Sequence, residues 1–245
     1  MSLFTKEIRP GAKAVMGLSG GMDSATVLAW LVDQGFEVHA LNFIYGSKHN
    51  KYEQKCAEAL AKHFGASYTL FDLTEAFKVM KSNLLQSGGE IPEGHYSHES
   101  MSLTVVPGRN TIFASIMCGV AESIGAEHIA LGVHQGDHDI YPDCRTEYVK
   151  SLDTTLYLAS GHKVNVIAPF MFTDKIGILE YGFDAKVPYD LTRTCYKDQE
   201  LSCGKCGSCN ERIEAFATHN QMDPVAYEGS IDWNAKFREF NKGYK

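Results

Sequence analysis

A short segment rich in glycine and serine, residues 18–24, constrains the fold of this chain more than any other stretch. Residues 14–18 form an apolar run typical of a buried strand, and residues 25–31 have the pattern of the first turns of a helix. Backbone N–H groups converge where a strand passes into a helix, and the helix N-terminus adds partial positive charge. Gly20 and Gly21 allow positive φ angles and let an anion approach closely. The segment therefore predicts a phosphate-binding turn.

The polar side chains of this turn indicate how it would hold phosphates. Ser19 and Ser24 offer hydroxyl donors, and the negative charge of Asp23 fits such a site if Mg²⁺ bridges its carboxylate to the phosphates. Neither G-x-x-x-x-G-K-[ST] nor G-x-G-x-x-G occurs in the chain. The residues expected to bind the nucleotide here are Leu18, Ser19, Gly20, Gly21, Met22, Asp23, Ser24, Ala25 and Thr26.

The order Ser-Gly-Gly-x-Asp-Ser at residues 19–24 resembles the signature of the PP-loop (N-type) ATP pyrophosphatases. Enzymes of this kind cleave ATP between the α and β phosphates and transfer AMP to a substrate oxygen. The resemblance implies ATP and Mg²⁺ as ligands, with Ser19 and Asp23 in the catalytic apparatus. The alternative is an ordinary Gly-Gly turn that Asp or Ser caps at the start of a helix.

Strand-like and helix-like segments alternate along most of the chain. Strands are expected at residues 14–18, 37–45, 67–73, 128–133 and 163–169, with helices at 25–31, 51–64, 110–124 and 147–159. Nearly all-apolar strands separated by helices indicate a parallel sheet that is covered on both faces. The predicted fold class is α/β, a doubly wound parallel five-stranded sheet of the adenine nucleotide alpha hydrolase-like type, with ligands at the carboxyl ends of its strands.

Four of the seven cysteines occur in one short stretch, with the spacing Cys195-x7-Cys203-x2-Cys206-x2-Cys209. Four soft ligands suit tetrahedral Zn²⁺, and C-x-x-C turns with small intervening residues bring two sulfurs towards one point. We expect a small C-terminal four-cysteine zinc knuckle whose ligands leave no open position for catalysis. A redox-active or sulfur-carrying dithiol is the alternative.

Composition excludes several classes of protein. The chain of 245 residues has a formal net charge of −7, which argues against a broad nucleic-acid-binding face. No apolar run reaches the length of a membrane span, and residues 1–13 lack the basic and apolar regions of a signal peptide. We therefore expect a cytoplasmic protein that binds neither membranes nor nucleic acid.

The expected domains are a PP-loop ATP-binding α/β domain at residues 12–190, a zinc-binding knuckle with a helix packed on that domain at 191–225, and a C-terminal tail at 226–245. Residues 82–106 interrupt the alternating pattern, and a long structureless loop of this kind is typical of a lid or a substrate-facing loop. In the tail, Trp233, Phe237 and Phe240 have helical spacing. This spacing favours a short helix docked on the core or across the boundary of a homodimer.

Three further stretches make the resemblance specific to one family of PP-loop enzymes. They are Phe-Ile-Tyr-Gly at residues 43–46, Val-Pro-Gly-Arg-Asn-Thr-Ile-Phe at 106–113 and Tyr-Pro-Asp-Cys-Arg at 141–145. Together with the knuckle they resemble the 7-cyano-7-deazaguanine synthase family of the queuosine pathway, from about residue 14 to residue 223. Gly108 departs from this pattern because a larger residue is expected there, and residues 135–140 depart from it in being rich in histidine and aspartate.

This resemblance implies that 7-carboxy-7-deazaguanine and ammonia are converted to the nitrile. A first ATP would adenylate the acid, ammonia would form the amide, and a second ATP would adenylate the amide oxygen so that loss of AMP leaves 7-cyano-7-deazaguanine. AMP and pyrophosphate would be released. Free ammonia is the expected donor because the chain begins Met1-Ser2-Leu3 rather than with the cysteine of a glutaminase domain.

Residues in the further stretches receive predicted roles. Arg109 is expected to stabilise the departing pyrophosphate as a planar cation, which makes it the third catalytic candidate. Phe43, Tyr45 and Asn110 are expected beside the nucleotide.

Recognition of the deazaguanine is assigned to a later part of the chain. The Asp143 carboxylate can accept hydrogen bonds from the amidine edge, and the Arg145 guanidinium can pair with the acid or the ring carbonyl. Asp137 and Tyr141 are also expected to contact the substrate. Loop salt bridges, and packing of Tyr141 beside its proline neighbour, are the alternatives.

The sequence leaves the acid or base of the reaction open. Asp137, His134 and His138 are the candidates near the end of the expected fourth strand. Cys144 has the chemistry of a nucleophile, but a phosphoanhydride route requires none.

Related activities remain open on the motifs alone. A family member could stop at the amide and serve DNA or protein modification, and a tRNA-thiolating PP-loop enzyme would share the phosphate turn. Thiolation requires a persulfide-bearing cysteine and a basic surface, neither of which is evident in the sequence. An asparagine-synthetase-like or NAD-synthetase-like enzyme and a silent nucleotide sensor are more distant alternatives.

Overall fold

Five parallel strands form one sheet in the computed structural model, which describes residues 9, 11–95, 99–138 and 140–241. The strands are β1 Lys13–Gly17, β2 Glu37–Ile44, β3 Ser67–Asp72, β4 His128–Ala130 and β5 Asn165–Ile167. Their order across the sheet is β3-β2-β1-β4-β5, so the direction of strand addition reverses at β1. The predicted parallel five-stranded sheet is confirmed, and its switch point between β1 and β4 is where ligands bind in such folds.

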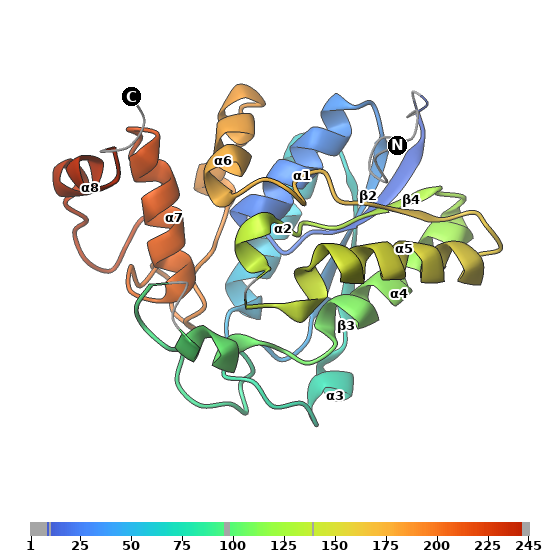
Figure 1. The fold of residues 1–245 in the computed structure, drawn as a ribbon, viewed down its shortest axis with the longest axis horizontal. Helices are drawn as coiled ribbons and strands as arrows, with labels where there is room; N and C mark the ends of the chain where they lie inside the picture. The colour runs from blue at the N-terminus through green and yellow to red at the C-terminus, as the bar shows by residue number, and fades with distance from the viewer. Residues whose placement is uncertain (1–8, 10, 96–98, 139, 242–245) are drawn as a thin grey trace.

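Helices cover both faces of the sheet (Figure 1). The α-helices of the described residues are α1 Met22–Asp33, α2 Asn50–Phe64, α3 Thr74–Phe77, α4 Arg109–Ile124, α5 Thr146–Ala159, α6 Lys175–Asp184, α7 Gly207–Thr218 and α8 Trp233–Phe240. Successive side chains of a strand point to opposite faces. In β1, Ala14 and Met16 belong to a hydrophobic core with α1, α2 and α6, whereas Val15 belongs to a second core with α4 and α5. The sheet is therefore doubly wound, as predicted.

Several boundaries differ from the sequence expectation. Helix α1 begins at Met22 rather than at residue 25, so half of the phosphate turn is the first turn of a helix. Strands β4 and β5 are each only three residues long. Helix α6 was not expected, because Gly177 and Gly182 interrupt its pattern; the structure needs Gly182, where a Cβ atom would lie 1.7 Å from Tyr189 Oη.

The loop at residues 82–106 is more ordered than the sequence indicates. Its described part includes a 3-10 helix at Glu99–Thr104 and a bridge between Glu93 and Cys206. The Gly94 N–H donates to the Lys205 carbonyl oxygen at 3.0 Å. Leu84, Leu85, Ile91 and Val106 pack with the four knuckle cysteines in a third hydrophobic cluster. The described residues of this loop therefore pack against the knuckle, and its role as a lid or a substrate-facing loop remains a prediction.

The C-terminal region packs on the α/β domain through α7 and α8, which lie together at the left of Figure 1. Arg212 of α7 is fully buried and forms a two-point ion pair with Asp223, at 2.6 and 2.9 Å. Trp233 of α8 packs against the core that contains α1, which agrees with the expected docked helix. Among the described helices, none is long and apolar enough to cross a membrane. The division into three domains remains a prediction.

Candidate active site

A cavity of about 240 Å³ opens at the carboxyl ends of three neighbouring strands. Its wall includes Gly17 and Leu18 from the end of β1, residues 41–43 of β2, and residues 130–133 at the end of β4. Asn42 ties two of these strands together, because its side-chain amide donates to the Leu18 carbonyl oxygen at 2.8 Å. The cavity thus lies at the switch point of the sheet, as the fold predicts.

The phosphate turn borders this cavity and is shaped by its own serines. The Gly21 N–H donates to Ser19 Oγ at 3.2 Å, and Ser24 Oγ donates to the Gly21 carbonyl oxygen at 3.0 Å. Gly21 is the N-cap of α1, and no side chain caps the first turn of that helix. The first N–H groups of a helix lack intrahelical partners, so this turn presents donors for an anion.

The two glycines of the turn have different roles. Gly20 has a φ angle of +90° and Gly21 has −78°, so only Gly20 uses the positive φ that glycine allows. The reason is that an N-cap residue adopts an extended conformation. Gly20 also allows close packing on α2, because a Cβ atom there would lie 2.5 Å from the Glu53 backbone oxygen.

Not every predicted nucleotide-binding side chain faces the cavity. Leu18, Ser19, Gly21, Asp23 and Ser24 line it. The remaining side chains of the set belong to the helix face that packs into the protein interior.

The inward-facing members are explained by their contacts. Met22 and Ala25 are fully buried in the core around α1. Thr26 Oγ1 donates to the Met22 carbonyl oxygen and lies 2.8 Å from Tyr189 Oη, away from the cavity wall. Side-chain contacts from these three residues to a nucleotide in the cavity are therefore not supported.

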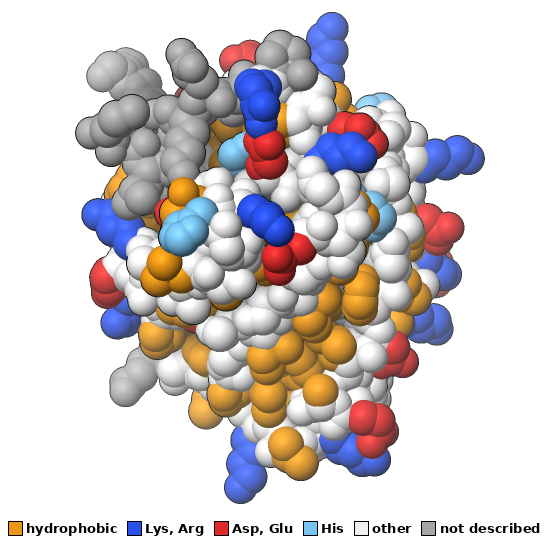
Figure 2. All heavy atoms as spheres, turned by 90° about the vertical axis from the view of Figure 1, so that its right-hand side faces the viewer, with side chains coloured by type: hydrophobic (Ala, Val, Ile, Leu, Met, Phe, Trp, Pro, Cys, Tyr) orange, Lys and Arg blue, Asp and Glu red, His pale blue; other side chains and the backbone are white. Residues whose placement is uncertain are grey.

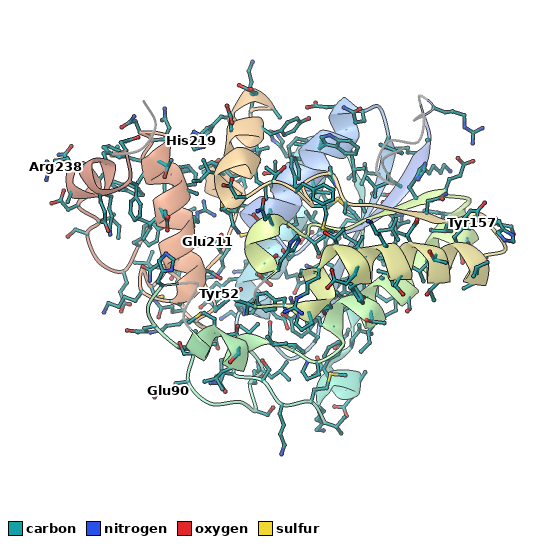
Figure 3. The ribbon with its side chains drawn as sticks, viewed as in Figure 1. Tyr52, Glu90, Tyr157, Glu211, His219 and Arg238 are labelled. Atoms are coloured by element: carbon teal, nitrogen blue, oxygen red, sulfur yellow. The ribbon has the colours of Figure 1, made fainter. Side chains whose placement is uncertain are left out.

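Asp23 forms a buried charge cluster with two residues that the sequence analysis missed. Lys175 Nζ donates to Asp23 Oδ2 at 2.7 Å and lies 3.1 Å from Glu211 Oε2. Lys175 is the first residue of α6, and Glu211 lies on the side of α7 that faces the centre of the molecule (Figure 3). The cluster brings together three elements that are far apart in sequence.

The charges of this cluster support one another. Burial raises the pKa of Asp23, but Lys175, His134 and Arg212 together outweigh that effect and hold the pKa below its usual value. Burial lowers the pKa of Lys175, and the two carboxylates reverse this to a net increase. Burial raises the pKa of Glu211. The ammonium therefore stays charged beside the phosphate turn, where it can stabilise a phosphate anion.

Asp23 Oδ1 is buried and has no hydrogen-bond partner among the described residues. An unpaired carboxylate oxygen next to a phosphate-binding turn suits a hard divalent cation. The expected Mg²⁺ therefore fits the donor that is present.

Aromatic side chains line the other end of the cavity. The Phe43 and Phe113 rings are stacked with centroids 4.2 Å apart, and Tyr45 meets Phe113 edge-on. Arg109 lies over the Tyr45 ring, with Nη1 3.4 Å from the Tyr45 hydroxyl. Gly108 precedes α4 with a φ angle of +65°, so its left-handed conformation explains why a larger residue is absent there.

The predicted substrate residues separate into two groups. Asp137 and Tyr141 line the cavity, and Tyr141 Oη lies 3.0 Å from Thr104 Oγ1. Asp143 and Arg145 do not line it. Asp143 Oδ2 accepts from the Asn110 N–H at 3.2 Å, and Arg145 donates to the His138 carbonyl oxygen at 2.8 Å. Their polar groups hold the start of α4 and the neighbouring loop through hydrogen bonds to backbone groups, and among the described residues neither forms the loop salt bridge that was the alternative.

Only some of the acid and base candidates from the sequence line the cavity. Asp137 lines the cavity, and its Oδ2 lies 3.5 Å from His134 Nε2. His138 does not line the cavity. Cys144 does, but burial raises the pKa of its thiol well above the usual value, which disfavours a nucleophilic thiolate.

Sequence reasoning missed several polar residues of the cavity wall, among them His49, Glu53, Lys175, Arg193 and Glu211. The positions of His49 and Glu53 could have been suspected from the sequence. Residues 47–53 directly follow the Phe-Ile-Tyr-Gly motif, at the end of β2, where polar side chains reach the ligand-binding edge of the sheet. Arg193 and Glu211 flank the four-cysteine stretch and Lys175 has no motif around it, and only the folded chain brings these three to the cavity.

The four predicted metal ligands come together beside this site. The Sγ atoms of Cys195, Cys203, Cys206 and Cys209 lie within 4.8 Å of one another, and all four residues are buried. Cys203 Sγ and Cys209 Sγ are 3.9 Å apart. Tetrahedral zinc with Zn–S bonds of about 2.3 Å requires sulfurs separated by about 3.8 Å. All seven cysteines are free of disulfides, so this donor set fits a closed zinc site.

The chain matches known proteins over most of its length. 7-Cyano-7-deazaguanine synthase from Pseudoalteromonas atlantica is 45% identical over 216 residues, which cover 88% of this chain and 99% of that protein. The protein of the same name from Caldicellulosiruptor bescii is 42% identical, with 90% and 100% covered. The solved structure of NMN synthetase from Francisella tularensis is similar with a TM-score of 0.45 and 14% identity, over 96% of this chain and 86% of that one.

A family model described as queuosine biosynthesis protein QueC matches residues 13–220. That range includes the phosphate turn, the buried charge cluster and all four knuckle cysteines. The chain belongs to the QueC family of queuosine biosynthesis proteins.

Proposed function

We propose that this protein converts 7-carboxy-7-deazaguanine and ammonia to 7-cyano-7-deazaguanine, and that ATP is cleaved to AMP and pyrophosphate. The observation that carries the proposal is the uncapped N-terminal turn of α1 beside the Lys175 ammonium, in a chain of the QueC family. Donors of this kind suit a diphosphate leaving group rather than a neutral ligand.

The chemistry follows from the weak reactivity of a carboxylate. Ammonia does not displace an oxygen from a carboxylate, so that oxygen must first become a leaving group. Attack of the carboxylate oxygen on the α phosphorus of ATP forms the acyl-adenylate, and pyrophosphate leaves. Ammonia then displaces AMP to give the amide, and a second transfer of AMP to the amide oxygen prepares loss of AMP as the nitrile forms.

The described residues divide this work between the two ends of the cavity. At the turn, Lys175 and the N–H groups of α1 would stabilise the negative charge that develops on the departing pyrophosphate. At the aromatic end, the flat surfaces of Phe43, Tyr45 and Phe113 offer stacking partners for a planar ring, and Arg109 supplies a cation. Exclusion of water from the reacting atoms would be needed during turnover, because water hydrolyses an acyl-adenylate.

Two metal ions belong to the proposal. Mg²⁺ would be held by Asp23 and would neutralise phosphate charge. Zn²⁺ would be held by the four knuckle cysteines and would stabilise the fold there.

Ammonia as the donor, a cytoplasmic location and a homodimer remain predictions. The face shown in Figure 2 carries hydrophobic side chains gathered in its lower half, a surface that a second copy could cover.

A product assay tests the proposed function. Purified protein is mixed with ATP, Mg²⁺, ammonium and 7-carboxy-7-deazaguanine, and mass spectrometry identifies the base and nucleotide products. We expect the nitrile, with two AMP formed per nitrile. Asp23→Ala should reduce pyrophosphate release by about 100-fold, because it removes the carboxylate that would hold Mg²⁺ beside the phosphates. Asp184→Ala, at the exposed end of α6, is the matched control and should keep full activity.

The other outcomes of this assay separate the alternatives. ADP in place of AMP would exclude the adenylation chemistry. An amide that persists with excess ATP would identify a family member that stops at the amide. A tRNA-thiolating activity has no support from the described structure, because Cys144 is buried with a raised pKa and the net charge of the chain is negative.

A further inference from the structure

A carboxyl group in the wall of the cavity has no role in the proposed chemistry so far. Glu53 lies in the first turn of α2, and its side chain is 14% exposed, towards the cavity. Its Oε2 atom lies 3.3 Å from Nε2 of His49, the N-cap residue of the same helix, which is 3% exposed. Tyr52, the residue before Glu53, is labelled in Figure 3 and marks the position of this turn.

Packing holds this carboxyl group close to the phosphate turn. The backbone of Glu53 contacts Gly20 so closely that only glycine fits there. The His49 ring packs against the Tyr45 and Tyr196 rings, with centroids 6.5 and 5.5 Å away. Glu53 is therefore fixed between the turn that would hold pyrophosphate and the aromatic end that would hold a ring.

The titratable and charged side chains around Glu53 come from several elements: His49, Tyr45, Cys56, Arg109 and Arg193. Burial raises the pKa of Glu53 to about 8, although Arg109 and Arg193 act in the opposite direction. Burial lowers the pKa of His49 to about 3, so its ring is neutral. Glu53 can therefore exchange a proton near neutral pH without a large energetic cost, whereas His49 stays neutral beside it.

The second half of the proposed reaction requires a proton acceptor. When the amide oxygen bonds to the α phosphorus and pyrophosphate leaves, one N–H bond of the amide breaks. When the nitrile forms, the second N–H bond breaks, its electron pair makes the third carbon–nitrogen bond, and the carbon–oxygen bond to AMP breaks with its pair. Two protons must therefore leave one nitrogen atom during the second half of the reaction.

We propose that the Glu53 carboxylate is the base that removes these protons, with His49 as the positioning residue that orients it. The inference rests on the proposed function, because it assigns a residue to one step of that reaction. After the first transfer, the proton passes from Glu53 to solvent, and the carboxylate then accepts the second. Asp137, which also lines the cavity and lies 3.5 Å from His134 Nε2, is the competing candidate from the sequence.

The test separates proton removal from adenylation. The variant Glu53→Gln keeps the shape of the side chain but cannot accept a proton. With 7-carboxy-7-deazaguanine, its ATP–pyrophosphate exchange should stay within about 3-fold of the wild-type rate, because adenylation of a carboxylate releases no proton. With the amide and ATP, nitrile formation should fall by about 10²–10⁴-fold, the usual contribution of a general base.

Two further measurements identify the role of each residue. In the wild type, kcat/KM for the amide should rise with pH through about 8, because Glu53 accepts a proton only in its charged form, which is populated above its pKa. Glu53→Asp should recover part of the rate and keep this rise, and Glu53→Gln should lose it. His49→Asn should lower the rate and keep the rise. Glu58→Gln, on the exposed face of α2, is the control and should match the wild type.

Each result has a distinct meaning. Wild-type protein that makes no AMP from the acid contradicts the proposed function itself. Wild-type activity together with normal nitrile formation by Glu53→Gln overturns only the role of Glu53. Equal losses of exchange and nitrile formation in Glu53→Gln would also overturn it, because they would indicate a structural role.

Discussion

At the scale of single residues, the phosphate turn depends on a glycine that meets two requirements at once. Gly20 adopts a φ angle that side-chain-bearing residues rarely take, and it also lies against the backbone of α2. Gly35 has a similar φ angle of +83°, yet a Cβ atom there would meet nothing within 4 Å. Alanine substitutions at these two positions therefore separate the energetic cost of backbone strain from the cost of steric overlap.

This comparison gives a stability prediction. Gly35→Ala should lower the free energy of unfolding by about 1–2 kcal/mol, the cost of a left-handed conformation. Gly20→Ala should cost roughly 1–3 kcal/mol more, because the new methyl group would overlap the Glu53 backbone oxygen. Urea denaturation of both variants measures the difference. Equal losses would mean that the turn and α2 are not packed as described.

At the scale of elements, α7 links the metal knuckle to the active site. Cys206 is the N-cap of this helix and Cys209 lies in its first turn, while Glu211 two residues later contacts Lys175. The next residue, Arg212, fixes the helix through its buried ion pair with Asp223. A metal ion at the four cysteines would therefore hold the helix that supplies one member of the charge cluster.

Loss of one knuckle ligand should show this connection. We expect the wild type to contain about one zinc ion per chain, measured by elemental analysis, and Cys206→Ser to lose it and to unfold at a lower temperature. Cys56→Ser, on α2 and outside the knuckle, should keep both the metal and the melting temperature. A stable and fully active Cys206→Ser protein without zinc would contradict a structural metal site and would favour a reactive dithiol.

At the scale of the whole molecule, the parts predicted from sequence are those with a local pattern. The strand before Ser19 and the helix after it follow from apolar periodicity, and the four cysteines follow from their spacing. Lys175 could not be predicted as the partner of Asp23, because 152 residues separate them and no motif surrounds it. Asp143 was assigned to the substrate from its chemistry, but the fold uses it at the start of α4.

The remaining differences have the same physical cause. A side chain in a loop after a strand can point into the site or back into the loop, and the sequence pattern does not distinguish these directions. Arg145 binds a loop carbonyl, while Glu53, in the helix after β2, faces the cavity. Periodicity predicts elements, and only tertiary packing decides which polar groups converge.

The position of a bound nucleotide tests the central claim most directly. A crystal structure with a non-hydrolysable ATP analogue and Mg²⁺ should show the β and γ phosphates against the N–H groups at the start of α1, with Lys175 Nζ within hydrogen-bond distance. The adenine ring or the deazaguanine should lie among the aromatic side chains at the other end of the cavity. A nucleotide bound elsewhere, with residues 18–24 making no contact to phosphate, would contradict the account.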